Sequence, residues 1–362
     1  MRVTTRRELL KGALATGIAA AILRPVAGAP ETESVNGLPI SQTVLGPLDA
    51  SKLGYTLPHE HIADGPYFLQ RWPKAWGGRR EFVDKSVESL KAVRAAGVST
   101  IVDLTTYDVF RDVRFLEEVS RKSGINMIAS TGQRFFPPNT DVLMPALTTE
   151  GLAEFFTKEI ERGIDGTSIR AGVIKIGIVA HQPTALEATG LRAAARASRA
   201  TGVPIRVHTD APHRAGESDA AILEDEGVSP ARVSFDHSDD SGDMDYFLGL
   251  AKRGYSLSMD HVHRGSISKF EPDFTRRAQC IKLLIDAGFA NKIFLSQDTG
   301  FGASLLPEEN KDWRDRLDPP EGMLFTTRKL IPHLQNMGVS IQQIHTITVE
   351  NPKNFFTKAP AN

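Results

Sequence analysis

The sequence has one cysteine, no long apolar run after its N-terminus and almost no net charge, and each feature excludes a class of protein. Its single cysteine, Cys280, excludes an intramolecular disulfide and a cluster of thiolate ligands around zinc. No stretch after residue 29 approaches the roughly 18 consecutive apolar residues of a membrane-spanning helix. The 43 basic and 44 acidic residues nearly balance, so nothing indicates a nucleic-acid partner. Any metal must be held by histidine, carboxylate or lysine chemistry.

Three common catalytic fingerprints are also missing: the G-x-S-x-G elbow, the P-loop and the glycine pattern of nicotinamide-binding folds. Serine-hydrolase, kinase and nicotinamide-dependent functions therefore have no support. Cys280 lies in an apolar helical stretch, which predicts a small core residue rather than a nucleophile.

The N-terminus has the pattern of an export signal. Residues 4–12 read TTRRELLKG, with a paired arginine, and Ala13–Leu23 form an apolar run too short to span a bilayer. Ala27–Ala29 supply the small residues of a cleavage site. We predict a twin-arginine signal over residues 1–29, export to the periplasm and no stable membrane insertion afterwards. The alternative is a basic tail. Residues 30–362 carry a net charge of −5, because the signal holds five basic residues and one acidic residue.

The rest of the sequence repeatedly passes from an amphipathic helical stretch through a glycine to a short apolar run. Such a glycine ends the helix, and the apolar run enters a buried parallel sheet. The predicted strands are Tyr55–His61, Thr100–Leu104, Asn126–Thr131, Gly172–Gly177, Ile205–His208, Val233–His237, Ser256–Asp260 and Ile293–Asp298. The predicted helices are Glu81–Ala96, Val113–Lys122, Thr149–Arg162, Ala185–Thr201, Glu217–Glu226, Asp243–Arg253, Phe274–Ala287 and Met323–Met337. Eight such units close as a TIM (β/α)8 barrel, a single domain over residues 30–362 with 30–50 as a lead-in.

Metal-binding side chains lie in or at the ends of five of these strands, and the active site of such a barrel lies where its strands end. They are His59, His61, Lys175, His208, His237 and Asp298. Because alternate residues of a strand point to one side, His59 and His61 face the interior together and can share one cation. We therefore predict a metal centre in the mouth of the barrel.

Lys175 lies among residues that the barrel would bury. Burial of an unpaired ammonium costs several kcal/mol, so the amine is driven toward its neutral form. One interpretation is an ion pair with a nearby carboxylate. The other is a carbamate, formed when the neutral amine adds carbon dioxide, whose two oxygens bridge two divalent cations. Asp298, the carbamate and a bridging hydroxide would then offset most of the charge of the two cations.

Two further residues suit proton transfer. His261, after strand seven, and Asp240, after strand six, could pass a proton away from Asp298 after attack by water. The alternative for Asp239 and Asp240 is to cap the helix that begins near Asp243. The loop and helix histidines are not expected to be ligands, and His263 is left open. The four histidines that are not expected to be ligands are His181, His213, His333 and His345.

In this order, the strand-end motifs resemble the bacterial phosphotriesterase family of the amidohydrolase superfamily. The resemblance covers residues 40–356 and includes Thr131-Gly132 and Val349-Glu350-Asn351-Pro352. The motifs are His59-Glu60-His61, Ile174-Lys175-Ile176-Gly177, Val207-His208-Thr209, Asp236-His237-Ser238-Asp239-Asp240, Met259-Asp260-His261 and Ser296-Gln297-Asp298.

The resemblance implies a role for each ligand. His59, His61 and Asp298 would bind the more buried of two divalent metal ions, usually zinc. His208 and His237 would bind the exposed ion, with the carbamylated lysine bridging the two. A hydroxide between the ions would attack the substrate, and Asp298 would take its proton. Members of the family act on organophosphate triesters, lactones and carboxylic esters, usually as homodimers.

The substrate pocket departs from the family pattern. Arg134 stands near a position where the family tends to have an aromatic residue, which predicts a cation at the pocket wall and favours an anionic or polar substrate oxygen. The long loop after Asp298 is closer to the triesterase style. The predicted substrate contacts are Tyr107, Arg134, Phe135 and Phe301.

Together these features predict a binuclear-metal hydrolase of organophosphate triesters or related esters. A lactonase or carboxylesterase with incidental triesterase activity is the first alternative. A metal-binding barrel without turnover and a single-metal hydrolase without the carbamate are the others.

Overall fold

Eight parallel strands form the centre of the protein, and they are ordered in the sheet as they are in the sequence. The computed structural model describes residues 39–62, 78–134, 148–264, 272–300 and 321–360. The strands are β3 (Thr56–Glu60), β4 (Thr100–Asp103), β5 (Asn126–Gln133), β6 (Val173–Gly177), β7 (Ile205–His208), β8 (Val233–Asp236), β9 (Ser256–Met259) and β10 (Ile293–Leu295). Each pairs in parallel with the next. The predicted TIM (β/α)8 barrel is confirmed.

The barrel closes through the residues that follow β10. The backbone N–H of His61 donates to the carbonyl of Thr299 at 2.9 Å, and that of Asp298 donates to the carbonyl of His59 at 3.1 Å. Beside them, the buried carboxyl of Glu60 accepts hydrogen bonds from the backbone and side chains of Gln297 and Thr299. Burial, opposed by these donors, raises the pKa of Glu60 to about 8. This closure places β3 beside the end of β10.

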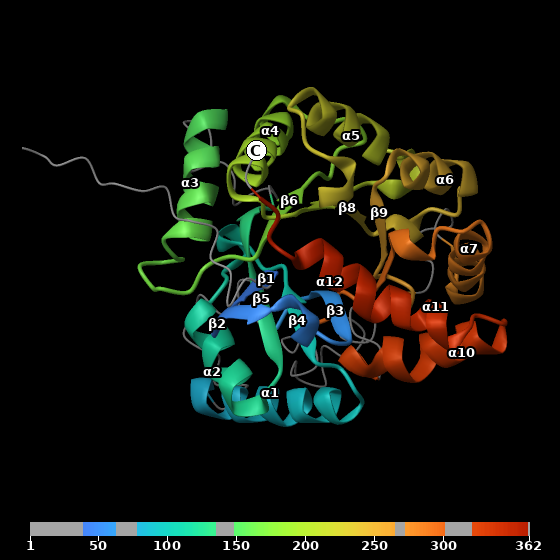
Figure 1. The fold of residues 1–362 in the computed structure, drawn as a ribbon, viewed down its shortest axis with the longest axis horizontal. Helices are drawn as coiled ribbons and strands as arrows, with labels where there is room; N and C mark the ends of the chain where they lie inside the picture. The colour runs from blue at the N-terminus through green and yellow to red at the C-terminus, as the bar shows by residue number, and fades with distance from the viewer. Residues whose placement is uncertain (1–38, 63–77, 135–147, 265–271, 301–320, 361–362) are drawn as a thin grey trace, which may run out of the picture. The chain divides into compact units, whose positions relative to one another are not determined.

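Helices surround the strands and follow one another around the barrel (Figure 1). They are α1 (Gly78–Ala95), α2 (Val113–Ser123), α3 (Thr149–Glu161), α4 (Ala185–Thr201), α5 (Gly216–Asp225), α6 (Met244–Arg253), α7 (Phe274–Asp286) and, after the π-helical turn Thr326–Leu330, α10 (Ile331–Asn336). Helix α4 shows why the bounds were predictable. Thr184 and Glu187 form a capping box at its start, and Gly202 ends it with a φ of 74°.

The strands are buried on both faces, as a parallel sheet covered by helices requires. All five residues of β6 are buried, and Lys175 among them has only 2% of its surface exposed. Gly132 of β5 permits close packing here, because a Cβ at that position would lie 1.8 Å from the carbonyl oxygen of Lys175. The lysine backbone is therefore held tightly between its neighbours.

The other end of the barrel is covered by a hairpin that was not predicted. Strands β1 (Ile40–Thr43) and β2 (Gly46–Asp49) pair antiparallel within the expected lead-in. Val44 donates its N–H to Met127, near the start of β5. The C-terminal helices α11 (Ile341–His345) and α12 (Asn351–Phe356) follow α10. These elements leave the carboxyl ends of the strands to the site.

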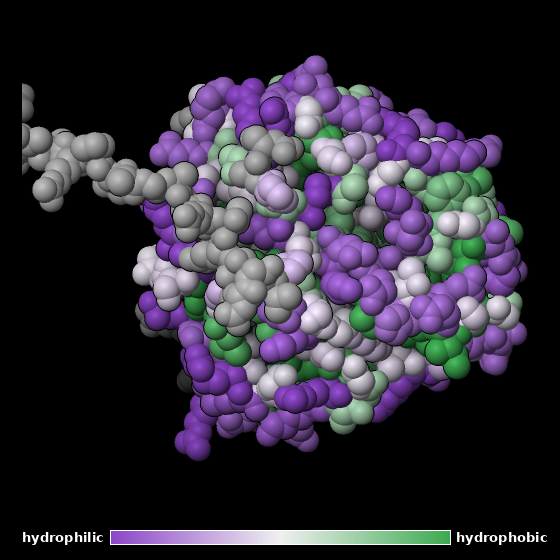
Figure 2. Space-filling model, in the orientation of Figure 1, coloured by the Kyte–Doolittle hydropathy of each residue, from purple (hydrophilic) through white to green (hydrophobic). Residues whose placement is uncertain are grey.

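All described residues belong to one compact unit, and the predicted signal over residues 1–29 lies outside them. Hydrophilic side chains cover most of the face in Figure 2. The large hydrophobic side chains exposed in the described part of the chain are Leu45, Val179, Leu283 and Ile341. Among the described helices, none combines the length and apolar character needed to cross a membrane.

Candidate metal centre

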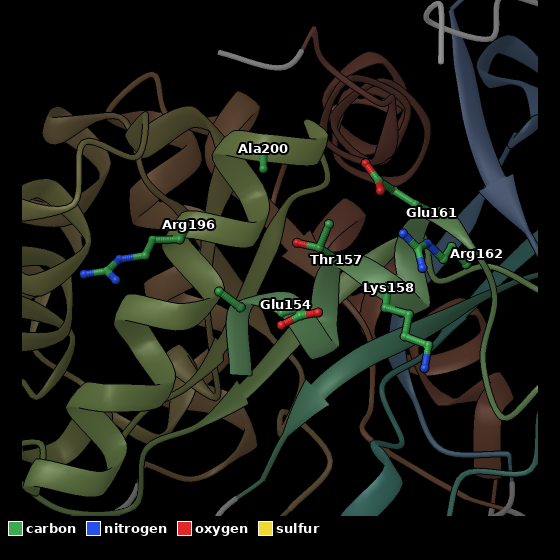
Figure 3. A pocket seen from close by; sticks show the side chains of 8 residues that line it. Glu154, Thr157, Lys158, Glu161, Arg162, Arg196 and Ala200 are labelled. Carbon is green, nitrogen blue, oxygen red and sulfur yellow. The ribbon is translucent and has the colours of Figure 1, made fainter. Parts of the chain in front are cut away.

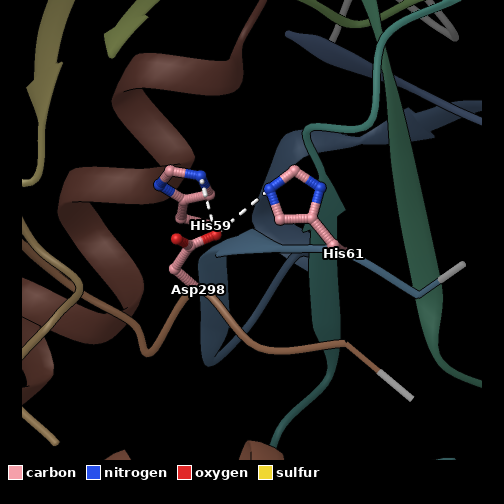
Figure 4. A group of neighbouring side chains, drawn as sticks. All are labelled: His59, His61 and Asp298. Atoms are coloured by element: carbon pink, nitrogen blue, oxygen red, sulfur yellow. Dashed lines mark ion pairs between the residues drawn. The ribbon is translucent and has the colours of Figure 1, made fainter. Parts of the chain in front are cut away.

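His59 of β3, His61 directly after that strand and Asp298 after β10 converge on a point inside the barrel mouth. The Nε2 atoms of His59 and His61 lie 3.3 and 3.1 Å from the same oxygen, Oδ1 of Asp298 (Figure 4). All three side chains are buried. Ligand atoms about 2.0–2.2 Å from a tetrahedral zinc ion lie about 3.3–3.5 Å from one another. Both nitrogen–oxygen distances are thus close to the spacing that one shared cation requires.

Two site residues have an uncommon backbone conformation. His237 has a φ of 58° and Asp298 a φ of 48°, in the left-handed region that costs a side chain other than glycine about 1–3 kcal/mol. Each lies just beyond the end of its strand, β8 or β10. The buried hydrogen bond from the His237 N–H to Asp260, 2.9 Å long, helps hold that turn. Both residues thus lie in turns at the strand ends, where their side chains contact the other site residues.

A second pair of imidazoles lies beside the first group. Nε2 of His237 is 2.8 Å from Nδ1 of His208, at the end of β7. The rings of His59 and His237 have their centroids 5.0 Å apart. The two nitrogens share a hydrogen bond, and they belong to the two histidines predicted to bind the second cation. The structure thus brings together the five predicted strand-end histidine and aspartate ligands.

Asp260, which sequence reasoning gave no role, holds two of these rings from behind. One carboxylate oxygen lies 2.6 Å from Nδ1 of His59, and the other lies 2.9 Å from Nδ1 of His237. A carboxylate acceptor fixes the proton on Nδ1, so the lone pair of Nε2 is available to a cation. Thr105 lies 2.9 Å from Nδ1 of His61 and orients the third ring. The only sequence signal was an aspartate directly before His261.

Lys175 lies close enough for its charge to act on His59 and on both histidines of the second pair. Its amine contacts the carboxylate of Asp236, the ion pair given above as the alternative to a carbamate. Burial is the main cause that lowers the pKa of Lys175, and Asp236 opposes it. Burial also lowers the pKa of His59, His208 and His237 well below the usual value, and the charge of Lys175 adds to this effect at each ring.

Asp236 has a second charged partner besides Lys175. Nε of the fully buried Arg206 donates to its other oxygen at 2.6 Å, and the same guanidinium donates to Ser258 at 2.8 Å. Arg206 and Asp236 thus form a buried pair beneath the centre. Neither was singled out from the sequence.

The predicted proton path forms a continuous chain of contacts. Nε2 of His261 lies 2.9 Å from Oδ2 of Asp298, and its Nδ1 lies 2.8 Å from Oδ2 of Asp240. Burial opposes the ionisation of Asp298, but the charge of His59 is among the effects that hold its pKa well below the usual value. Burial also opposes a charge on His261, yet Asp240 and Asp298 raise its pKa to about 9. The ring of His261 thus connects the carboxylates of Asp298 and Asp240.

The alternative capping role of the acidic pair is wrong. Asp243 caps α6, accepting from the N–H groups of Asp245 and Tyr246 at 2.9 and 3.1 Å. Asp239 instead accepts from the N–H groups of Asp260 and His261. Both Asp239 and Asp240 pair with the buried guanidinium of Arg277 on α7. These carboxylates support the turn after β9.

One cation at the centre was missed from the sequence. Arg264 donates to Oδ2 of Asp298 at 2.9 Å, beside His261. It follows β9 in the turn Val262–Arg264, where its N–H donates to the His261 carbonyl. No strand periodicity extends to this turn, so only the folded chain reveals the contact.

The structure describes two of the four predicted substrate contacts, Arg134 and Tyr107. Arg134 directly follows β5, its N–H donates to Asp108 at 2.9 Å, and its charge contributes to the low pKa of His208. Tyr107 lies after β4 with its ring edge against Phe155, 5.3 Å between centroids. The predictions for Phe135 and Phe301 lie outside the described residues.

A separate hollow of about 290 Å³ lies between the outer helices α3 and α4 (Figure 3). Side chains of both charges line it, and no predicted site residue does. Its lining residues are Ala153, Glu154, Thr157, Lys158, Glu161, Arg162, Arg196 and Ala200.

The donor set fits divalent metal ions. Imidazole nitrogens and a carboxylate are common zinc ligands, and carboxylate or hydroxyl groups behind three of the rings orient them as metal-ligating histidines require. Fold and site together define a barrel with a candidate metal centre at the carboxyl ends of its strands.

Comparison with known proteins places the chain in a family. The profile of the phosphotriesterase family matches residues 39–356. The solved structure of the phosphotriesterase from Mycobacterium tuberculosis is 32% identical, with a TM-score of 0.78, over 88% of this chain and 99% of that one. An aryldialkylphosphatase from Saccharolobus solfataricus is 32% identical over 86% of this chain and 97% of its own length. The chain belongs to the phosphotriesterase family and is a metal-dependent hydrolase.

Relatives differ in what they are named for. An N-acetyltaurine hydrolase from Xenopus tropicalis is 27% identical over 87% of this chain and 97% of its own length. Family membership thus establishes the hydrolase and leaves the bond and the substrate to the pocket.

Proposed function

We propose that the protein is a binuclear-metal hydrolase of ester bonds that acts on organophosphate triesters or related esters, lactones included. The observation that carries this proposal is the convergence of His59, His61 and Asp298 beside the facing nitrogens of His208 and His237. These are two adjacent groups of side chains, and each group would bind one cation. Two divalent ions, zinc in the first instance, would supply Lewis acidity for the electrophile and lower the pKa of the attacking water.

Lys175 is the residue that would join the two groups, as a carbamate. Burial lowers the pKa of its amine, and the neutral amine can add carbon dioxide, forming a nitrogen–carbon bond and releasing a proton. The carbamate exchanges a positive charge for a negative one beside the cations. Asp236 would keep Arg206 as its partner, so the loss of the lysine charge leaves no carboxylate unpaired.

The proton released from the attacking water would move along side chains of this chain. Asp298 accepts it, His261 relays it and Asp240 holds the far nitrogen of that ring. Arg264 supports Asp298 as a carboxylate between turnovers. Arg134 would stabilise a polar or anionic oxygen of the substrate at the pocket wall.

Paired substrates test the proposal and its ester specificity. A nitrophenyl dialkyl phosphate, an acyl lactone and an N-acetyl aminosulfonate are compared at equal concentration with zinc-loaded protein and with a chelator control. We expect zinc-dependent turnover of the triester or the lactone above that of the amide. A protein that hydrolyses only the amide, or binds zinc without turnover of any substrate, contradicts it. Arg134→Leu, with exposed Arg121→Leu as control, then tests whether Arg134 determines the preference.

Export and assembly are further proposals, carried by the N-terminal sequence and by the family resemblance. The paired arginine of TTRRELLKG would direct the folded chain to the periplasm, and the mature protein would be a homodimer. Replacement of Arg6 and Arg7 by lysine should retain the protein in the cytoplasm. Light scattering of residues 30–362 should give twice the mass of the chain, and the mass of one chain would contradict the dimer.

A further inference from the structure

A second group of metal-binding side chains lies outside the centre described above. His181 comes from the segment between β6 and α4, and Asp210 and His213 follow β7. Nδ1 of His213 lies 3.0 Å from both carboxylate oxygens of Asp210, and Nδ1 of His181 contacts the same carboxylate. The two rings lie with their centroids 3.7 Å apart and their planes inclined by 31°. One ligand atom from each residue lies within reach of a single cation.

The backbone on the β6 side of this group is held by a buried carboxylate. Glu187 accepts from the N–H groups of Val179 and Ala180 at 2.8 and 3.3 Å, and from the N–H of Thr184 at 2.8 Å. These contacts stand on both sides of His181. The first turn of α4 therefore holds the backbone on both sides of His181.

The backbone on the β7 side is a tight turn. The carbonyl of Asp210 accepts from the N–H groups of His213 and Ala215 at 3.2 and 3.1 Å, so the aspartate and the second histidine share one turn. Arg214, the nearest cation along the chain, pairs with Glu217 and Asp243 instead. The turn thus presents a carboxylate and an imidazole together.

Two carboxylates lie near this group, and its side chains are accessible. The charges of Asp210 and Glu187 add to the effect of burial in raising the pKa of Asp219, which Thr209 contacts at 2.9 Å, to about 8. Two carboxylates therefore act on the same small region. The side chains of His181 and His213 are 65% and 56% exposed, and that of Asp210 is 17% exposed. An ion could reach them from solvent.

We propose that His181, Asp210 and His213 bind one divalent transition-metal ion, at a rim site separate from the barrel centre. Two imidazoles and one carboxylate are a ligand set of zinc enzymes, and imidazole also suits copper and nickel. Three protein ligands on an exposed surface leave positions for water or for an anionic group. The site holds its ion more weakly than the enclosed centre, because solvent competes for it. The proposal does not depend on the function proposed above.

Zinc binding to the full chain tests the rim site. Chelator-treated protein is dialysed against increasing zinc, and bound zinc is measured by atomic emission for the wild type, His181→Ala/His213→Ala and Asp210→Asn. His345→Ala, which removes another exposed histidine, is the matched control. We expect the double variant to lose one zinc equivalent and Asp210→Asn to bind that equivalent at least about tenfold more weakly. The control should bind as the wild type does.

A variant that lacks two ligands of the barrel centre allows zinc binding at the rim site to be measured by itself. In His59→Asn/His61→Asn, the rim equivalent should remain and should disappear when the rim pair is also replaced. Circular dichroism checks that each variant is folded. If the double variant is not folded, Asp210→Asn still tests the proposal. Equal zinc content in the wild type and all folded rim variants overturns the proposal. Loss of the same equivalent in His345→Ala also overturns it, because the binding would then be non-specific.

Discussion

The barrel centre and the rim site use the same side chains, two histidines and one aspartate, in opposite surroundings. In the centre, His59, His61 and Asp298 are buried, and further side chains orient both rings. At the rim, the two histidines are more than half exposed, and in the contacts described above their rings meet only each other and their own aspartate. Both groups therefore offer metal ligands by side-chain type. We expect enclosure and the supporting groups to decide how tightly an ion is held and whether the site can do chemistry.

The largest expected effect is a loss of catalysis at the barrel centre, which the rim site should not share. Lys175→Ala removes the proposed bridge between the two ligand groups of the centre. We expect hydrolysis to fall by at least about 10³-fold, beyond the 10–100-fold typical of residues behind the ligands. A short carboxylic acid such as acetate should restore part of it. Initial rates measure this, with the exposed Lys158→Ala as control, and an undiminished rate in Lys175→Ala would exclude the bridge.

The next effect separates the regions by stability. Arg206→Ala leaves Asp236 without its buried guanidinium partner. Breaking a buried ion pair costs about 3–5 kcal/mol of the free energy of unfolding. His213→Ala, at the exposed rim, should change that free energy by less than about 0.5 kcal/mol. Urea unfolding of both variants checks the contrast, and equal losses would show that burial does not distinguish the regions.

A smaller effect concerns the groups behind the ligands. Asp260→Asn keeps the size of the side chain that holds His59 and His237 but removes its charge. Zinc affinity of the centre should fall about 10–100-fold, while binding at the rim should be unaltered. Competition with a chromophoric chelator measures both. Unchanged affinity at the centre would mean that the two rings need no carboxylate behind them.

The smallest effect is a dependence of stability on pH near the rim. Burial raises the pKa of Asp219 from 3.8 to about 8, so the folded chain keeps a proton that the unfolded chain releases. Stability from this group is present below pH 3.8 and is lost as pH rises toward 8. The difference in stability between Asp219→Asn and the wild type should therefore shift in favour of the variant as the pH rises from 5 to 7. Thermal melting at each pH checks it; a constant difference would contradict it.

The barrel and its strand-end side chains were predictable because both follow from local patterns. A glycine before a buried apolar run gave the strand bounds within a few residues, and alternation placed His59 and His61 on one side. Contacts that depend on the direction of a turn were not. Arg264 reaches Asp298 from the turn after β9, and Asp260 holds rings from two different strands. The same reason applies to His181 and His213, which are 32 residues apart in the sequence.

Anomalous scattering from zinc-loaded crystals tests the central claim most directly. We expect two strong peaks in the barrel mouth, one among His59, His61 and Asp298 and one between His208 and His237. Density beyond Nζ of Lys175 should connect them. A single peak with an unmodified lysine paired to Asp236 would contradict the binuclear centre.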